Sequence, residues 1–518
     1  MEKEDHKKEL HSTIHPTLAV YLSGNFNDQP VHSFNSNSSS NGEGTKCSAY
    51  LEKLSKNRLQ SSSVVGGLLI LLVSGLHIGW GIWRIDFNEP WFQGISGVFI
   101  FIVLSFYVGA IIGGIMTGFI INIWRKQAIY YLSGSIMVIS SLISIIWCSN
   151  QMGILFCRVM AGLGHGLAYN VVIVHAGDNS MKKMRGIITS NINCFLWFST
   201  FFGSLLIATV QMGVSTTISS DRMIGIFGLV FSVLALTYTM FWTEESVVYL
   251  LNRGKLGEAL ELLSKLRNEP EASTSVADDF EEMRLMVNRD KLENQNIFLN
   301  NNEKPLGLMV ALKFLHILTN NFMINWIFMI ITTGILPRGN RRLSPVILSA
   351  VRFIGSFIQT FLGDSFGRKT FLNTSCTLAG VTVLILEILL IAVTDYTQAT
   401  YGLVSALCIA FQFFVAFGID PMHNVILSEA FSTSKKNWSL VFVNTCENVA
   451  HMLLIGICFV DGVIFSSVYH LVLFISVTFI LILIVILVFY LPETQGLSLG
   501  QSRDAFRNIT TRCSWYRR

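Results

Sequence analysis

Twelve long apolar runs are the feature that most constrains what this chain can fold into. A bilayer core about 30 Å thick needs roughly 20 apolar residues for one helical crossing. Only 14% of the 518 residues are charged, 51% are hydrophobic, and the mean hydropathy is +0.53. The sequence therefore predicts an all-α integral membrane protein with twelve transmembrane helices. The expected helices lie at 62–83, 97–121, 128–148, 153–176, 187–210, 224–242, 308–336, 345–362, 371–393, 401–425, 440–460 and 465–491.

The spacing of the runs also predicts how the chain is divided. Residues 35–42 are almost entirely Ser and Asn, a composition that buries too little apolar surface to fold. The stretch between the sixth and seventh runs is polar and has an amphipathic helical pattern. We expect a disordered cytoplasmic tail, a six-helix bundle, a cytoplasmic helical linker, a second six-helix bundle and a cytoplasmic tail, at 1–60, 61–242, 243–305, 306–491 and 492–518.

Basic residues in the short loops predict the orientation, because Lys and Arg resist translocation. Arg125 and Lys126, and later Arg368 and Lys369, fall on the same side as the basic residues after the fourth and tenth runs. That side is expected to be the cytoplasm, with both termini in it. The basic loop at 338–342 falls on the opposite side and breaks the rule.

An internal repeat at a spacing of about 250 residues indicates two similar halves, as expected of many transporters. Charged residues recur at equivalent loop positions after the second, fourth and sixth runs of each half. The pairs are Arg125 and Arg368, Asp178 and Glu429, and Glu245 and Glu493.

The motifs at these corners resemble those of the sugar porters in the major facilitator superfamily. The segment 364–369 matches the loop D-x-x-G-R-[RK], and 492–496 is similar to the terminal P-E-T-K-G. Arg158 with three following glycines resembles the R-x-x-x-G-x-G-x-G of helix 4. The resemblance covers about residues 62–500. It implies two pseudo-symmetric six-helix bundles that rock about a central site, and transport of a sugar such as a hexose or trehalose.

The resemblance also implies a charge clamp between the bundles. Arginine and acidic side chains at the bundle ends would pair across the halves and close one side of the pore. The residues concerned are Arg125, Arg185 and Glu245 in the first half and Arg368, Glu429 and Glu493 in the second. The alternative is that these are solvated loop charges.

A polyol stripped of water needs replacement hydrogen bonds, so amides near the midplane are the expected substrate ligands. The family places them on helices 5, 7 and 10. The residues of this chain at or near those positions are Asn193, His316, Asn320, Asn321 and Asn424. The alternative for helix 7 is hydrogen bonding between helices. Helix 7 lacks the Gln-Gln pair of the family, and Asn424 stands where the family has tryptophan.

Two ionisable residues inside apolar runs do not come from the family pattern, namely Arg352 and Glu447. Charge within a membrane span is costly and usually marks a pathway or a cavity. They would contact a charged solute or couple a proton; otherwise they form a structural pair or reach the interface.

No phosphate-binding loop, metal motif or nucleophile elbow is recognisable. We therefore expect no enzyme activity, no cofactor and no metal, and no nucleic-acid partner. The expected partners are a small solute and the lipid bilayer, with the chain acting as a monomer in the plasma membrane. Two other functions stay open: a carrier of a different, charged organic solute, and a transporter-like sensor or scaffold that moves nothing.

Overall fold

The computed structural model describes residues 58–83, 97–211, 218–293, 296–299, 301–392, 397–459 and 468–509. Within these ranges the chain is helical and contains no strand. Eleven helical segments there are long and apolar enough to cross a membrane, and α20 (Val468–Tyr490) is a further apolar helix. The expected all-α membrane fold is confirmed. The predicted disordered tail lies outside the described residues up to position 57, and the first helix begins at Arg58.

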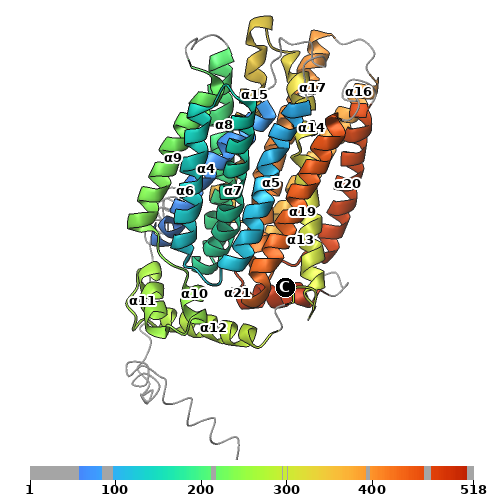
Figure 1. The fold of residues 1–518 in the computed structure, drawn as a ribbon. Helices are drawn as coiled ribbons and strands as arrows, with labels where there is room; N and C mark the ends of the chain where they lie inside the picture. The colour runs from blue at the N-terminus through green and yellow to red at the C-terminus, as the bar shows by residue number, and fades with distance from the viewer. Residues whose placement is uncertain are drawn as a thin grey trace, which may run out of the picture.

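The helices form an upright bundle with the two halves side by side (Figure 1). The first half contains α4 (Arg58–Trp83), α5 (Gly97–Ile120), α6 (Lys126–Ile146), α7 (Gln151–Asn179), α8 (Arg185–Gln211) and α9 (Ser220–Trp242). The second half contains α13 (Glu303–Thr319), α14 (Phe322–Thr333), η1 (Arg338–Leu343), α15 (Ser344–Leu362), α16 (Arg368–Ala392), α17 (Gln398–Phe414), η2 (Val415–Ile419), α18 (Asp420–Glu429), α19 (Thr433–Phe459) and α20.

Four short helices gather at one end of the bundle, which we call the linker end (Figure 1). They are α10 (Val247–Asn252), α11 (Leu256–Arg267), α12 (Thr274–Lys291) and α21 (Leu499–Arg507). Buried side chains such as Leu263 and Phe280 give the linker helices a small core of their own. The segment expected to be a C-terminal tail thus contains a helix, with a capping box at Ser498 and Gln501.

Glycines allow α5 and α7 to pack backbone against backbone. A Cβ on Gly162 would lie 2.0 Å from the Phe106 carbonyl oxygen, and one on Gly166 would lie 2.1 Å from that of Ala110. Small residues on one face permit this approach where no hydrophobic force drives helices together.

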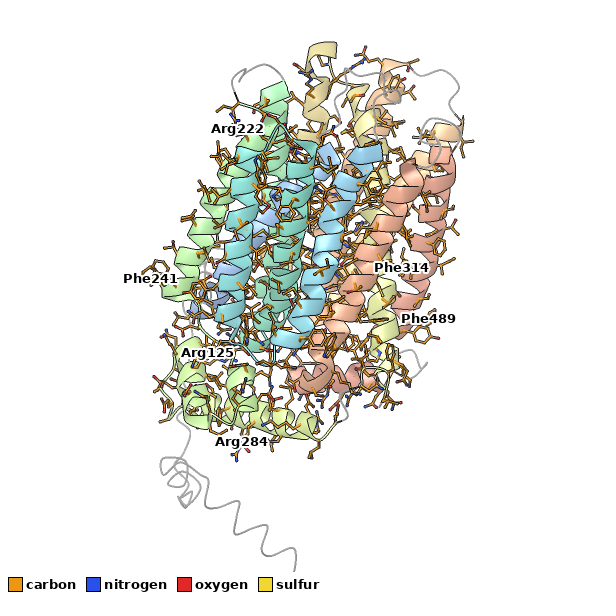
Figure 2. The ribbon with its side chains drawn as sticks, in the orientation of Figure 1. Arg125, Arg222, Phe241, Arg284, Phe314 and Phe489 are labelled. Atoms are coloured by element: carbon orange, nitrogen blue, oxygen red, sulfur yellow. The ribbon has the colours of Figure 1, made fainter. Side chains whose placement is uncertain are left out.

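Large apolar side chains cover the outside of the bundle. Phe241, Phe314 and Phe489 are 64%, 45% and 49% exposed and project outward from its sides (Figure 2). Arg125 and Arg284 lie at the linker end and Arg222 near the opposite end (Figure 2). An apolar belt between charged ends is the surface that a bilayer requires.

Two of the expected membrane spans contain local irregularities that the hydrophobic pattern does not predict. The run at 308–336 divides into α13 and α14, because Asn320 leaves helical geometry and Asn321 caps α14 by accepting from the Ile324 N–H. The run at 401–425 contains the π-helix η2, in which the Asp420 N–H donates to the Val415 carbonyl. Pro421 follows it and cannot donate to the carbonyl four residues earlier, so the widened turn has a local cause.

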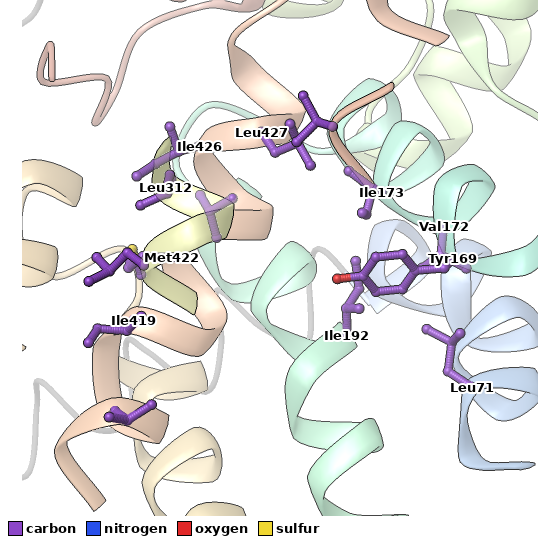
Figure 3. Packing of buried hydrophobic residues seen from close by; sticks show 14 of the residues in the cluster. Leu71, Tyr169, Val172, Ile173, Ile192, Leu312, Ile419, Met422, Ile426 and Leu427 are labelled. Atoms are coloured by element: carbon purple, nitrogen blue, oxygen red, sulfur yellow. The ribbon is translucent and has the colours of Figure 1, made fainter. Parts of the chain in front are cut away.

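The two halves meet along several helices. α5 packs on α19, and α8 packs on α15 and α18. Tyr169 reaches from α7 with its hydroxyl directed toward the side where Leu312, Ile419 and Met422 of the second half lie (Figure 3). Polar side chains at the centre of this contact form the candidate site.

Candidate functional site

A cavity of about 110 Å³ lies between the halves and is lined by both of them. Its first-half wall includes Asn193 and Trp197 of α8, together with two tyrosines and His165. Its second-half wall includes His316, Asn320 and Glu447. Amide, indole and phenol groups in an aromatic setting form the kind of pocket in which a few polar groups orient a small solute.

The five predicted substrate residues do not all reach this cavity. Asn193, His316 and Asn320 line it. Asn424 lies behind it, donating to Asn193 Oδ1 at 3.1 Å and accepting from the Tyr169 hydroxyl at 2.9 Å. The side chain of Asn321 caps α14 by accepting from the Ile324 N–H, and Asn321 is not among the residues that line the cavity.

Arg352 and Glu447 are both buried, and each has an ion-pair partner of its own. Arg352 lies 3.3 Å from Asp420 Oδ2, donates to the Thr319 carbonyl at 3.0 Å, and packs 4.5 Å from the centre of the Trp197 ring. Lys313 lies 2.7 Å from Glu447 Oε2. His316 Nδ1 lies 2.7 Å from the other oxygen of the same carboxylate.

Asp420 joins the halves at the centre of this network. Its carboxylate accepts from the Trp197 indole at 2.9 Å, and its backbone carbonyl accepts from the Asn193 amide. Both donors lie on α8 of the first half, whereas Asp420 opens α18 of the second. The residues predicted from the sequence did not include Asp420, Lys313, Trp197 or Tyr169. The first two are ionisable residues in apolar runs, so the criterion that selected Arg352 would also have found them.

The cavity also brings His316, Glu447 and His451 together, with potential ligand atoms within 4.8 Å of one another. Both oxygens of Glu447 are already engaged by Lys313 and His316. The Lys313 ammonium would repel a cation at this position. The arrangement is therefore better described as a carboxylate hydrogen-bonded to His316 and Lys313, with His451 close by, than as a metal site.

At the linker end, two buried ion pairs connect the halves. Arg185 lies 3.2 Å from Glu429, with side-chain exposures of 3% and 0%. Lys436 lies 3.0 Å from Asp178. The sequence repeat makes Asp178 equivalent to Glu429, so the two pairs are related by the pseudo-symmetry of the bundle.

A third contact at this end joins a loop carboxylate to a helix terminus. Asp364 accepts from the backbone N–H groups of Gly186 and Ile187 at 3.1 and 2.9 Å. These groups belong to the first turn of α8, where free N–H groups and the helix dipole favour an anion. Arg368 lies 2.7 Å from the same carboxylate and 3.9 Å from Glu429.

Two further members of the expected clamp, Glu245 and Glu493, make contacts within their own half. Glu245 accepts from the Lys126 N–H at 2.9 Å, and Glu493 accepts from the Arg368 N–H at 2.8 Å. Each carboxylate thus caps a helix of its own half. Burial raises the pKa of Glu245. Arg125 is exposed and directly precedes α6.

Comparisons with known proteins agree with the fold and the motifs. The sequence model of the family described as "Sugar (and other) transporter" matches residues 47–506. A protein named hexose transporter 1 from Plasmodium knowlesi is 22% identical over 427 residues, covering 78% of this chain and 82% of that protein. A facilitated trehalose transporter, Tret1 from Apis mellifera ligustica, is 24% identical over 430 residues, covering 79% of each chain.

Solved structures share the architecture. The proton:xylose symporter XylE bound to 6-bromo-6-deoxy-D-glucose superposes with a TM-score of 0.71 at 18% identity, covering 89% of this chain and 99% of that one. The inward-open conformation of XylE from E. coli gives 0.56 at 16% identity, covering 88% and 99%. With its matching family model and repeated motifs, the chain belongs to the sugar (and other) transporter family, the sugar porters of the major facilitator superfamily.

Proposed function

We propose that this protein carries a hexose, trehalose or a similar small polar solute across a membrane by alternating access. The observation that carries the proposal is the cavity between the halves, to which Asn193 and Trp197 contribute from one side and Asn320 from the other. A solute held by groups of both halves changes its exposure when the halves rock against each other. The names of the relatives favour a sugar.

The contacts at the linker end would act as the gate of this movement. Arg185–Glu429, Lys436–Asp178 and the Asp364 contact with α8 all join the two halves. They must separate before the cavity can open toward that end. All three contacts are present in the structure, as expected of a carrier whose cavity is closed toward the linker end.

We further propose that the linker end faces the cytoplasm, so that both termini lie there, and that one chain acts alone in the plasma membrane. The basic residues of the linker-side loops support this orientation. In this arrangement 61–242 and 306–491 are the two moving bundles, and 243–305 is the linker between them.

A second candidate substrate class is a charged organic solute. Glu447 lines the cavity, and Lys313 and Asp420 stand directly behind its wall. A cationic sugar derivative such as an amino sugar could exchange ion-pair partners with Glu447. Competition of amino sugars and sugar acids against labelled glucose would separate this class from neutral sugars.

The test of the proposed function is uptake of radiolabelled glucose and trehalose into cells that display the protein at their surface. Saturable uptake is expected for the wild type and a loss of about tenfold or more for Asn193→Ala, because one lost polar ligand costs about 1–3 kcal/mol. Asn252→Ala, on the exposed linker, is the matched control. If the surface-expressed wild type moves neither sugar, the proposal fails for these solutes.

A further inference from the structure

His316 lies between two carboxylates that belong to different helices. Its Nδ1 is 2.7 Å from Glu447 Oε1 of α19, and its Nε2 is 3.4 Å from Asp420 Oδ1 of α18. The Nε2 atom is also 3.4 Å from the amide nitrogen of Asn320. The imidazole therefore has a partner for each nitrogen whether it carries one proton or two.

The two protonation states use these partners differently. In the neutral ring, Nδ1–H donates to Glu447 and Nε2 accepts from the Asn320 amide. In the protonated ring, Nε2–H is a donor aimed at Asp420 Oδ1. That oxygen is fully buried and has no hydrogen bond among the described residues. A buried acceptor without a donor is costly, so a proton on His316 would satisfy a defect in the neutral arrangement.

Each of the two carboxylates has a basic partner other than His316. Lys313 pairs with Glu447, and Arg352 pairs with Asp420. The ring of His423 lies 4.3 Å from that of His316, centre to centre. The titratable and charged groups that face the imidazole or share its cavity are Lys313 of α13, Arg352 of α15, Asp420 and His423 of α18, Glu447 and His451 of α19, Tyr107 of α5, and His165 and Tyr169 of α7.

Protonation of His316 would affect the hydrogen bonds that join the two halves. Asp420 receives the Trp197 indole on its other oxygen and the Asn193 amide on its backbone carbonyl. A new hydrogen bond from His316 to Asp420 would therefore change the position or charge distribution of the residue that accepts from Trp197 and Asn193. The same imidazole lines the cavity proposed to hold the solute.

We propose that His316 is a proton carrier, and that solute movement through this protein is coupled to proton movement in the same direction. This inference rests on the proposed function. On the side to which the cavity is open, an N–H bond forms at Nε2 as an O–H bond of hydronium breaks and leaves water. On the other side the N–H bond breaks and the proton returns to water.

The test uses the full chain reconstituted into vesicles that contain a pH-sensitive dye. Addition of glucose or trehalose outside should acidify the lumen. Tracer uptake should be several-fold faster with the outside at about pH 5.5 than at about pH 7.5, on either side of the ordinary histidine value of about 6.5. A protonophore should abolish the solute-dependent acidification but not downhill tracer uptake.

Variants then assign the effect to one residue. In His316→Gln, whose amide cannot titrate, any remaining uptake should proceed at the same rate at both pH values and without acidification. His175 lies at the linker end beside Tyr130 and Asn179. His175→Gln should therefore keep the wild-type ratio of the uptake rates at the two pH values. Saturable wild-type uptake without acidification would overturn the coupling and leave the proposed function intact. Absence of tracer uptake at every pH would overturn both.

Discussion

Lys313 and Glu447 form an ion pair inside the bundle, with side-chain exposures of only 2% and 10%. Removing two charges from water costs several kcal/mol for each ion, and only a close partner offsets that cost. His316 adds a second hydrogen-bonding partner for the carboxylate. At the scale of single residues, the site is therefore a set of mutually dependent charges in which no member can be removed alone without penalty.

We expect Glu447→Gln to destabilise the protein by about 3–5 kcal/mol, because it leaves the Lys313 ammonium buried without a counter-charge. The double variant Lys313→Met/Glu447→Gln should regain most of this loss. The measurement is the apparent melting temperature of purified protein in detergent. Glu258→Gln, which breaks the exposed pair Lys255–Glu258, is the control and should change stability by at most about 1 kcal/mol. A Glu447→Gln variant with the same apparent melting temperature as the wild type would contradict this account.

The sequence identified individual charges but not their partners. Arg352 and Glu447 stand out because ionisable residues in apolar runs are rare. Their partners lie 68 and 134 residues away in the chain, and no local pattern links positions so far apart. Helical spacing correctly placed His316 and Asn320 together, since they are one turn apart. The capping of α14 by Asn321 could not be predicted from the sequence, because capping depends on where the helix breaks.

At the scale of elements, the twelve-run pattern predicted the helices well and their interruptions poorly. A transmembrane helix is recognised from the length of an apolar run and from its mean hydropathy. A break of only two residues, such as Asn320 and Asn321, changes neither quantity much, so the run looks continuous. The interruption nevertheless decides the site, because it lies beside the cavity. Pro421 was a visible signal for the second interruption, since proline disturbs the helix preceding it.

We expect Gly162→Ala to disrupt the bundle, because the added Cβ would lie 2.0 Å from the Phe106 carbonyl oxygen and α5 would have to move. Gly402→Ala is the matched control: the same methyl group is added within a helix, but no atom of the described residues outside that helix turn lies within 4 Å of it. The first variant should lower the apparent melting temperature and the amount of monodisperse protein. The second should be neutral or slightly stabilising, since alanine favours a helix by about 1 kcal/mol over glycine. Equal behaviour of the two would argue against backbone contact between α5 and α7.

At the scale of the whole molecule, the repeat predicted the symmetry of the linker end better than its connections. Glu245 and Glu493 are equivalent, and each caps the helix of its own half. Asp178 and Glu429 are also equivalent, and each pairs with a base of the other half. Position in the sequence does not distinguish a carboxylate that caps a helix of its own half from one that pairs with the other half, because both kinds lie near basic residues. Three-dimensional packing alone decides which half supplies the partner.

The bridging contacts lead to a prediction about the conformational equilibrium. Arg185→Ala removes a buried contact between the halves, so it should populate the state in which the linker end is open. Ser428, fully buried at this end, reports the change when replaced by cysteine in a cysteine-free background. Its labelling by a thiol reagent applied from the linker side should become several-fold faster in Arg185→Ala. Lys182→Ala is the control, because its pair with Glu282 is exposed and contained in the first half and linker. Labelling that is slow in both variants would show that the Arg185–Glu429 pair does not hold the gate, and would leave Asp364 and its contact with α8 as the closing element.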